Sequence, residues 1–234
     1  MERRELSAKL IELLSLTLRP VAVTFRDQAP DGVANAARSV PSGCSFWRAA
    51  EKSVFYAAAH QHFNCPIGAM VMGFELPSHI QNELGIAVET MCEVGYLDPA
   101  EAASLPSVRS GRKGAVYGPL ADVSVDPDVV LMWLTPAQAM LFSEAAGTAA
   151  WTGEQLRVSG RPACTALPLA LNAQEPRLSL GCAGMRIFTH ISGELLLAVL
   201  PGAKVEEFLT SLTALVKANA AMGDYYQAKE ADLA

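Results

Sequence analysis

The chain has 234 residues, of which 51% are hydrophobic and 18% charged, so it is long enough and apolar enough to bury a large core. This composition excludes an intrinsically disordered chain. The net charge of -6 at pH 7, without a large cluster of Lys or Arg, offers no basic surface to a phosphate backbone, so we expect no nucleic-acid partner.

An amphipathic helix is predicted over residues 1–18. Leu6, Leu10 and Leu14 recur at helical spacing, and acidic residues interrupt what could otherwise be taken for a secretory signal. The sequence contains no run of eighteen or more apolar residues, which is the length that crosses a membrane. We therefore expect a cytoplasmic protein without a membrane partner.

Strands and helices then alternate. Pro20 ends the first helix, and the apolar, β-branched residues 21–25 predict a buried strand. Residues 27–41 contain turn signals and predict a loop. A short helix is expected over residues 45–52, and a second strand over residues 54–59.

The middle of the chain carries clear helix starts. The spacing of apolar residues predicts a helix over 77–96, and Asp98 is predicted to cap the next one. Strands are predicted over 114–120 and 128–134, the latter hydrophobic enough to be buried on both faces. A Thr-Pro pair is then expected to start a helix over 137–146.

The last part repeats the alternation. A helix is predicted over 165–171, a strand over 177–181 that enters a Gly-Cys-Ala-Gly turn, a strand over 194–200, and an amphipathic helix over 204–221. Residues 222–234 are expected to form a polar, frayed tail. Together the elements predict an α/β fold, a single domain over residues 1–234 with a mixed central sheet flanked by helices.

The five cysteines are the residues richest in chemistry. Their odd number and the lack of an export signal argue against a disulfide framework. Four of them adjoin Gly, Pro or Ser in predicted turns, whereas the fifth, Cys92, lies in a predicted helix. The four are Cys44, Cys65, Cys164 and Cys182.

Thiolates on loops are well suited to hold a metal, because backbone N–H groups in turns can point at the sulfurs. Four of them would satisfy a 4Fe-4S cluster or a tetrahedral zinc ion, and a Pro after a ligand cysteine, as in Cys65-Pro66, is a feature of iron–sulfur ligation. The sequence leaves two alternatives open: buried thiols without a ligand role, and a redox or nucleophilic thiol.

Three further side chains are candidates for supporting roles. His60 and His62 alternate, so on a strand they would share one face and could turn toward Cys65. The alternative is a polar edge bonded to backbone or water. Arg186, four residues after Cys182, could balance thiolate charge or bind an anionic ligand, or form a surface ion pair. Haem is a further alternative cofactor, although the chain has no Cys-x-x-Cys-His motif.

Several familiar motifs are missing. The chain has no GxGxxG after a strand, no GxxxxGK[ST], no HExxH and no GxSxG. Their absence argues against the common dinucleotide, nucleotide triphosphate, zinc protease and α/β-hydrolase sites.

The chain resembles the family catalogued as domain of unknown function 169. The resemblance covers about residues 10–215 in order and is carried by residues 20–23, Cys44, 65–69, 127–131, 136–140, 180–186 and 200–202. The chain departs from the family pattern at Ile67, where a glycine is common, and at Met185, where a serine is common. The resemblance supports the four turn cysteines as a set and implies no particular reaction.

We expect a cytoplasmic iron–sulfur or metal-binding protein that acts in redox or cofactor-dependent chemistry on a small molecule. The competing hypothesis is a metal-free protein that binds a small molecule or haem in an apolar pocket and has a reactive or structural thiol. Whether the protein is an enzyme stays open. The apolar composition is compatible with a homo-oligomer.

Overall fold

A mixed sheet lies at the centre of the computed structural model, which describes residues 1–109, 111–147 and 158–232. Its strands are short, and most are formed by apolar residues. In chain order they are β1 (Val21–Arg26), β2 (Phe55–Ala58), β3 (Gly114–Pro119), β4 (Val129–Leu134), β5 (Val158–Ser159), β6 (Arg177–Ser179) and β7 (Leu196–Pro201).

The strand order is β2-β3-β1-β4-β7-β6-β5. Every neighbouring pair is antiparallel except β5 and β6, which are parallel, so the sheet is mixed as predicted. The longest registers join β1 to β3 and β4 to β7, where Val130 pairs with Leu200. The buried strands expected over 21–25, 114–120, 128–134 and 194–200 are confirmed within one or two residues.

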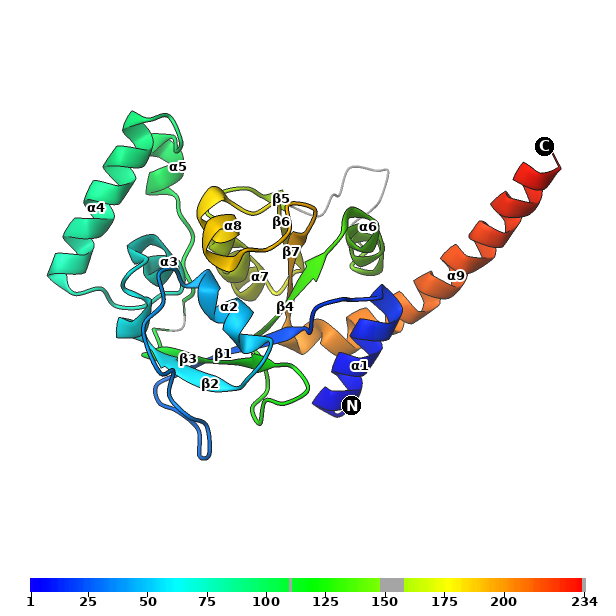
Figure 1. Cartoon of the computed structure of the whole chain (residues 1–234), viewed down its shortest axis with the longest axis horizontal. Coiled ribbons are helices and arrows are strands. Elements are labelled where there is room, and N and C mark those ends of the chain that lie inside the picture. Colours follow the sequence, from blue (N-terminus) through cyan, green and yellow to red (C-terminus); the bar gives the residue numbers. More distant parts are fainter. Residues whose placement is uncertain (110, 148–157, 233–234) are drawn as a thin grey trace.

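Helices cover both faces of this sheet (Figure 1). The α-helices are α1 (Arg3–Leu14), α2 (Cys44–Ala50), α3 (Pro66–Val71), α4 (Ser78–Glu93), α5 (Pro99–Ala103), α6 (Pro136–Ala145), α7 (Ala166–Ala173), α8 (Ala183–Thr189) and α9 (Val205–Ala231). Three single 3₁₀ turns join them, η1 (Ala59–His62), η2 (Ala163–Thr165) and η3 (Gly202–Lys204). The predicted α/β class, a mixed sheet flanked by helices, is confirmed.

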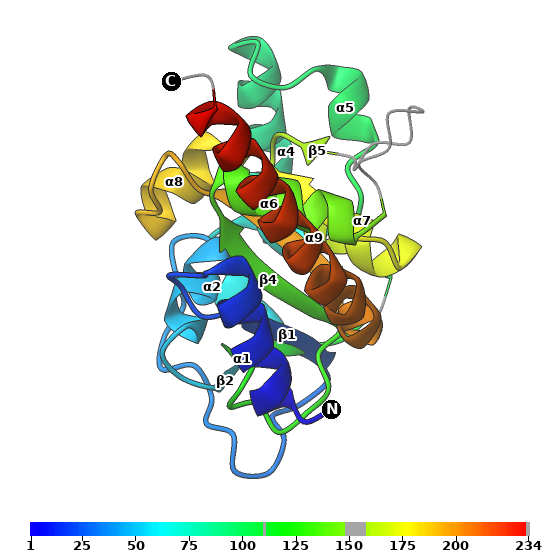
Figure 2. The ribbon, with the colours of Figure 1, turned by 90° about the vertical axis from the view of Figure 1, so that its right-hand side faces the viewer.

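Side-chain alternation along the strands divides the core in two. In β4, Val129, Leu131 and Trp133 face one core and the residues between them face the other. The first core packs under α2, α3 and α7. The second packs under α1, α6 and the first half of α9 (Figure 2). β4 is therefore buried on both faces, as its unbroken apolar sequence predicted.

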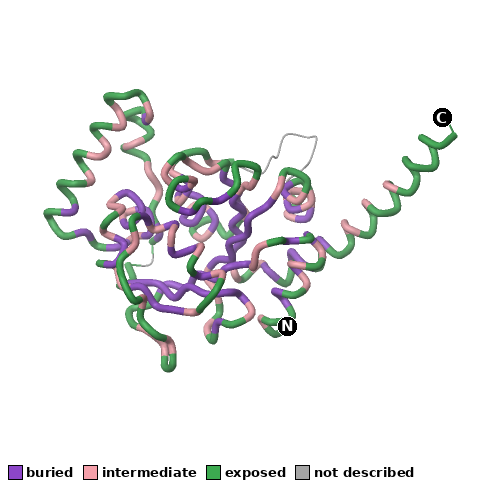
Figure 3. Tube along the Cα trace, viewed as in Figure 1, coloured by how far each residue is buried: buried purple, intermediate pink, exposed green. Residues whose placement is uncertain are grey.

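Two helical segments extend from this body. α4 and α5 project on one side, and the second half of α9 projects on the other (Figure 1). Both are exposed over most of their length (Figure 3). The frayed tail predicted from residue 222 onward is wrong for 222–231, because α9 continues to Ala231; residues 233–234 lie outside the described residues.

The local signals that start the helices mostly act as expected. Asp98 accepts from the Ala100 amide at 2.8 Å and caps α5. Thr135 accepts from the Gln138 amide at 3.3 Å and caps α6. The predicted turn after β6 instead begins α8, with Cys182 in the N-cap position. No helix in the described part of the chain has the length and hydropathy needed to cross a membrane.

Candidate functional site

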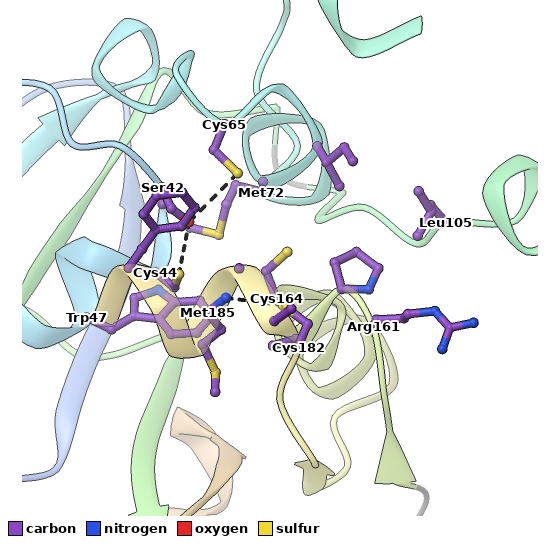
Figure 4. Close-up of a pocket in the computed structure, with 18 of the residues that line it drawn as sticks. Ser42, Cys44, Trp47, Cys65, Met72, Leu105, Arg161, Cys164, Cys182 and Met185 are labelled. Carbon is purple, nitrogen blue, oxygen red and sulfur yellow. Dashed lines mark hydrogen bonds between the residues drawn. The ribbon is translucent and has the colours of Figure 1, made fainter. Parts of the chain in front are cut away.

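The four turn cysteines come together in one pocket. Cys44 is the first residue of α2, Cys65 directly precedes α3, Cys164 lies in η2 and Cys182 directly precedes α8. All four line a cavity of about 320 Å³ on the first-core side of the sheet (Figure 4). The structure therefore brings together side chains that the sequence spaces far apart. We call this cavity the four-thiol pocket.

Small residues and prolines fit the chain around these sulfurs. Pro66 occupies the first turn of α3, where its missing N–H costs no helical hydrogen bond. A Cβ at Gly68 would lie 2.9 Å from the Cys65 sulfur, so a larger residue would displace the thiol. Gly181, with φ of +87°, turns the chain into Cys182 in a conformation that favours glycine.

Polar groups contact three of the four sulfurs, those of Cys44, Cys65 and Cys182. The buried Ser42 hydroxyl lies 2.9 Å from the Cys44 sulfur and donates to the Cys65 sulfur at 3.9 Å, so it links two thiols. The Met185 amide donates to the Cys182 sulfur at 3.4 Å. The sequence alone did not indicate a role for Ser42.

Burial favours the protonated form of two of the thiols, Cys44 and Cys164. Burial raises the pKa of Cys44 to about 11, and the Ser42 hydroxyl opposes this only in part. Burial and the neighbouring thiols raise the pKa of Cys164 well above its ordinary value. Either cysteine would have to lose its proton before it could bind a metal.

The four thiols line the cavity and do not converge on a single metal position. Within the described residues, no group of three or more His, Cys, Asp or Glu side chains is close enough to hold a single metal ion. A tetrahedral zinc ion needs four ligand atoms each within about 2.3 Å of one centre. The arrangement as it stands is therefore not a preformed zinc site.

The two histidines do not share a face. They lie on η1 and not on a strand, because the strand ends at Ala58. His60 is exposed and lines a separate open pocket beside Lys113. His62 is 1% exposed, with Nδ1 3.0 Å from the Ala58 carbonyl and Nε2 2.9 Å from the Tyr117 hydroxyl. Neither histidine lines the four-thiol pocket, although Tyr117 does.

Arg186 faces backbone and not the pocket. Its guanidinium donates to the carbonyls of Leu180, Ser192 and Leu195 at 2.7, 3.0 and 3.4 Å. These bonds hold the chain on both sides of α8, and so support the segment that carries Cys182. Arg186 does not line the four-thiol pocket.

Sequence reasoning missed a second wall of the pocket. Met91 at the end of α4, Tyr96 and Leu105 contribute it from the projecting segment, opposite the thiols. Cys92 adjoins Met91 but does not line the pocket. Arg161, close to Cys164, also lines it and lies over the Tyr96 ring, with 4.9 Å from its guanidinium carbon to the ring centre. Only their positions in the folded structure identify these residues as part of the pocket.

Comparison with known proteins gives one family. The sequence model of DUF169, described as uncharacterised ArCR, matches residues 9–211. No curated protein and no solved structure matches the chain significantly. The matched range contains all four cysteines of the pocket.

Proposed function

The chain belongs to the DUF169 family, and we propose that it binds an iron–sulfur cluster through Cys44, Cys65, Cys164 and Cys182. In this proposal the cluster serves redox or cofactor-dependent chemistry on a small molecule. The observation that carries the proposal is that these four thiols, from four separate segments, line one cavity while Cys92 does not.

A cluster suits the pocket better than a single ion does. A 4Fe-4S cluster takes one thiolate at each of four corners, so its ligands surround a volume. In the four-thiol pocket the four thiols line one cavity, and no three of the described ligand side chains are placed to hold one ion. The charge of bound iron would favour the thiolate form of each cysteine.

The other pocket residues have roles that follow from their positions. Ser42 and the Met185 amide would offset negative charge on three of the sulfurs through hydrogen bonds. Trp47, Met72 and other apolar side chains would limit the access of water. When bound, the cluster would supply one-electron transfer.

A metal-free pocket for a small molecule is the second candidate. Its support is the lining, which is largely apolar, and the cavity volume, which lies near the lower end of the range for small-molecule sites. Haem is less well supported as the occupant. Both ring nitrogens of His62 already have partners and His60 lies elsewhere, so a haem iron would depend on a cysteine.

Anaerobic purification and reconstitution with iron and sulfide test the proposal. We expect a broad visible absorption shoulder, with iron and acid-labile sulfide in equal amounts, and loss of most of this signal in the Cys65→Ser and Cys182→Ser variants. The matched control is Cys92→Ser, which should keep the full signal because Cys92 lies outside the pocket.

Three results would overturn the proposal. The first is a reconstituted protein that holds neither metal nor sulfide. The second is a signal that survives in the pocket variants, and the third is a signal that disappears in Cys92→Ser. A sharp Soret band on haem addition, with no iron–sulfur signal, would instead support the second candidate.

A further inference from the structure

We propose that the four-thiol pocket binds a small apolar molecule with one anionic group, and that Arg161 recognises that group. The inference rests on the proposed function in that it names the ligand class of the same pocket. It depends on the second wall of the pocket, which contains Met91, Tyr96 and Leu105 and has no role in the cluster proposal.

The pocket has one charged lining residue, Arg161. Among its lining residues Arg161 is the only one with a formal charge at pH 7, and none is Asp or Glu. In the described part of the chain no carboxylate forms an ion pair with Arg161. Its donors are therefore available to a ligand, and carboxylate or phosphate oxygens match the planar guanidinium group.

The structure holds Arg161 at the pocket. Its guanidinium lies 4.9 Å from the centre of the Tyr96 ring, which restricts its orientation. The backbone on either side is tied down, because Ser179 donates to the Gly160 carbonyl at 3.4 Å and Thr165 donates to the Pro162 carbonyl at 2.8 Å. Arg161 is exposed as a residue, which places its charge at the rim.

The rest of the pocket suits an apolar body. The projecting segment supplies Met91, Leu97 and Leu105, and Phe188 lies at the rim with 42% of its surface exposed. Burying apolar ligand surface against such side chains favours binding. An anionic group beside Arg161 would then fix the orientation of the ligand.

Three eight-carbon probes test the inference by calorimetric titration. Octanoate and octyl phosphate carry an anionic group, and 1-octanol has the same chain without charge. We expect the anions to bind on the order of tenfold more tightly than 1-octanol. If only one anion does so, the class narrows to carboxylates or to phosphates. Equal affinity for the three probes, or no binding, would overturn the inference.

Three arginine variants locate the effect, of which Arg161→Gln and Arg38→Gln each remove one positive charge and Arg161→Lys keeps it. Arg161→Gln should remove the preference for the anions, while Arg161→Lys should keep part of it. Arg38→Gln, an exposed arginine outside the pocket, should behave as the wild type. An unchanged preference in Arg161→Gln would contradict the role of Arg161.

The titrations are made on metal-free and reconstituted protein, with iron and sulfide measured separately. Arg161-dependent binding to a protein that never takes up a cluster would refute only the cluster. A protein that holds its cluster but shows no Arg161-dependent preference would refute only this inference.

Discussion

Burial keeps the His62 side chain neutral. The ring lies between Phe46 and Phe74, with ring centres 4.8 Å apart in both cases, and burial lowers the pKa of His62 to about 4. A carbonyl can only accept, so Nδ1 donates to Ala58 and Nε2 accepts from the Tyr117 hydroxyl. Protonation would leave a buried charge facing a hydroxyl group.

This arrangement predicts a pH dependence of stability. In the unfolded chain His62 has an ordinary pKa near 6.5, so between about pH 4 and pH 6.5 the unfolded state binds more protons than the folded state. The free energy of unfolding should therefore be fully present above pH 6.5 and fall toward pH 4 by about 3 kcal/mol from this group. Urea unfolding of the metal-free protein across this range measures it.

Two histidine variants separate this effect from other titrations. His62→Gln should be less stable at neutral pH but should lose most of the slope between pH 4 and 6.5. His60→Gln, which changes an exposed histidine two residues earlier, should keep the wild-type slope. A slope that survives in His62→Gln would show that another group is responsible.

The residue scale also shows where sequence reasoning succeeds. Cys65 and Gly68 form a local motif, and the sulfur does require the space that glycine leaves. His60 and His62 do not share a face, because that prediction required a strand and the strand ends at Ala58. Arg161 gave no usable signal, since its role depends on Tyr96, which lies 65 residues away in sequence.

At the scale of elements, α9 has two different halves. Its first half packs Val205, Phe208 and Leu212 into the second core. Residues from 220 onward are exposed, apart from a half-buried Gly223, yet they continue the helix. Ala, Gln, Lys and Glu are good helix formers, which explains why the helix does not end where its apolar stripe does.

This division predicts that the second half of α9 adds little stability. Deleting residues 222–234 should change the melting temperature by no more than about 2 °C, because few contacts are lost. Leu212→Ala, in the buried half, should cost about 2–5 kcal/mol through the cavity it leaves. Thermal unfolding followed by circular dichroism compares the two. A large loss on deletion would mean that the distal half is packed, for example against a second copy.

Most elements could be predicted because their ends carry local chemistry. The Asp98 cap and the Thr135-Pro136 pair mark boundaries that depend on local hydrogen bonds, whereas the first helix ends at Leu14, before the boundary predicted from Pro20. α8 was missed because Gly181 and Gly184 favoured a turn, whereas Cys182 in fact caps the helix. The projecting α4 was expected as a helix, but its place opposite the thiols depends on contacts remote in sequence.

At the scale of the whole molecule, the pocket brings together four segments that lie far apart in the sequence. α2, α3, η2 and α8 all lie on the first-core side of the sheet, and each contributes one cysteine. The four cysteines therefore lie together over one face of the sheet. A ligand held by all four cysteines would connect these segments and so affect the stability of the entire fold.

A cluster bound to all four thiols would stabilise the folded chain, because the unfolded chain has no preformed site for it. We expect removal of the cluster under anaerobic conditions to lower the melting temperature by roughly 5–10 °C, the range for ligand near 100 times its dissociation constant and a chain of this length. The same treatment of Cys65→Ser, which should hold little cluster, controls for damage and should cause no comparable shift. Equal melting temperatures for fully reconstituted and stripped wild-type protein would show that the four segments are not joined through a common cluster.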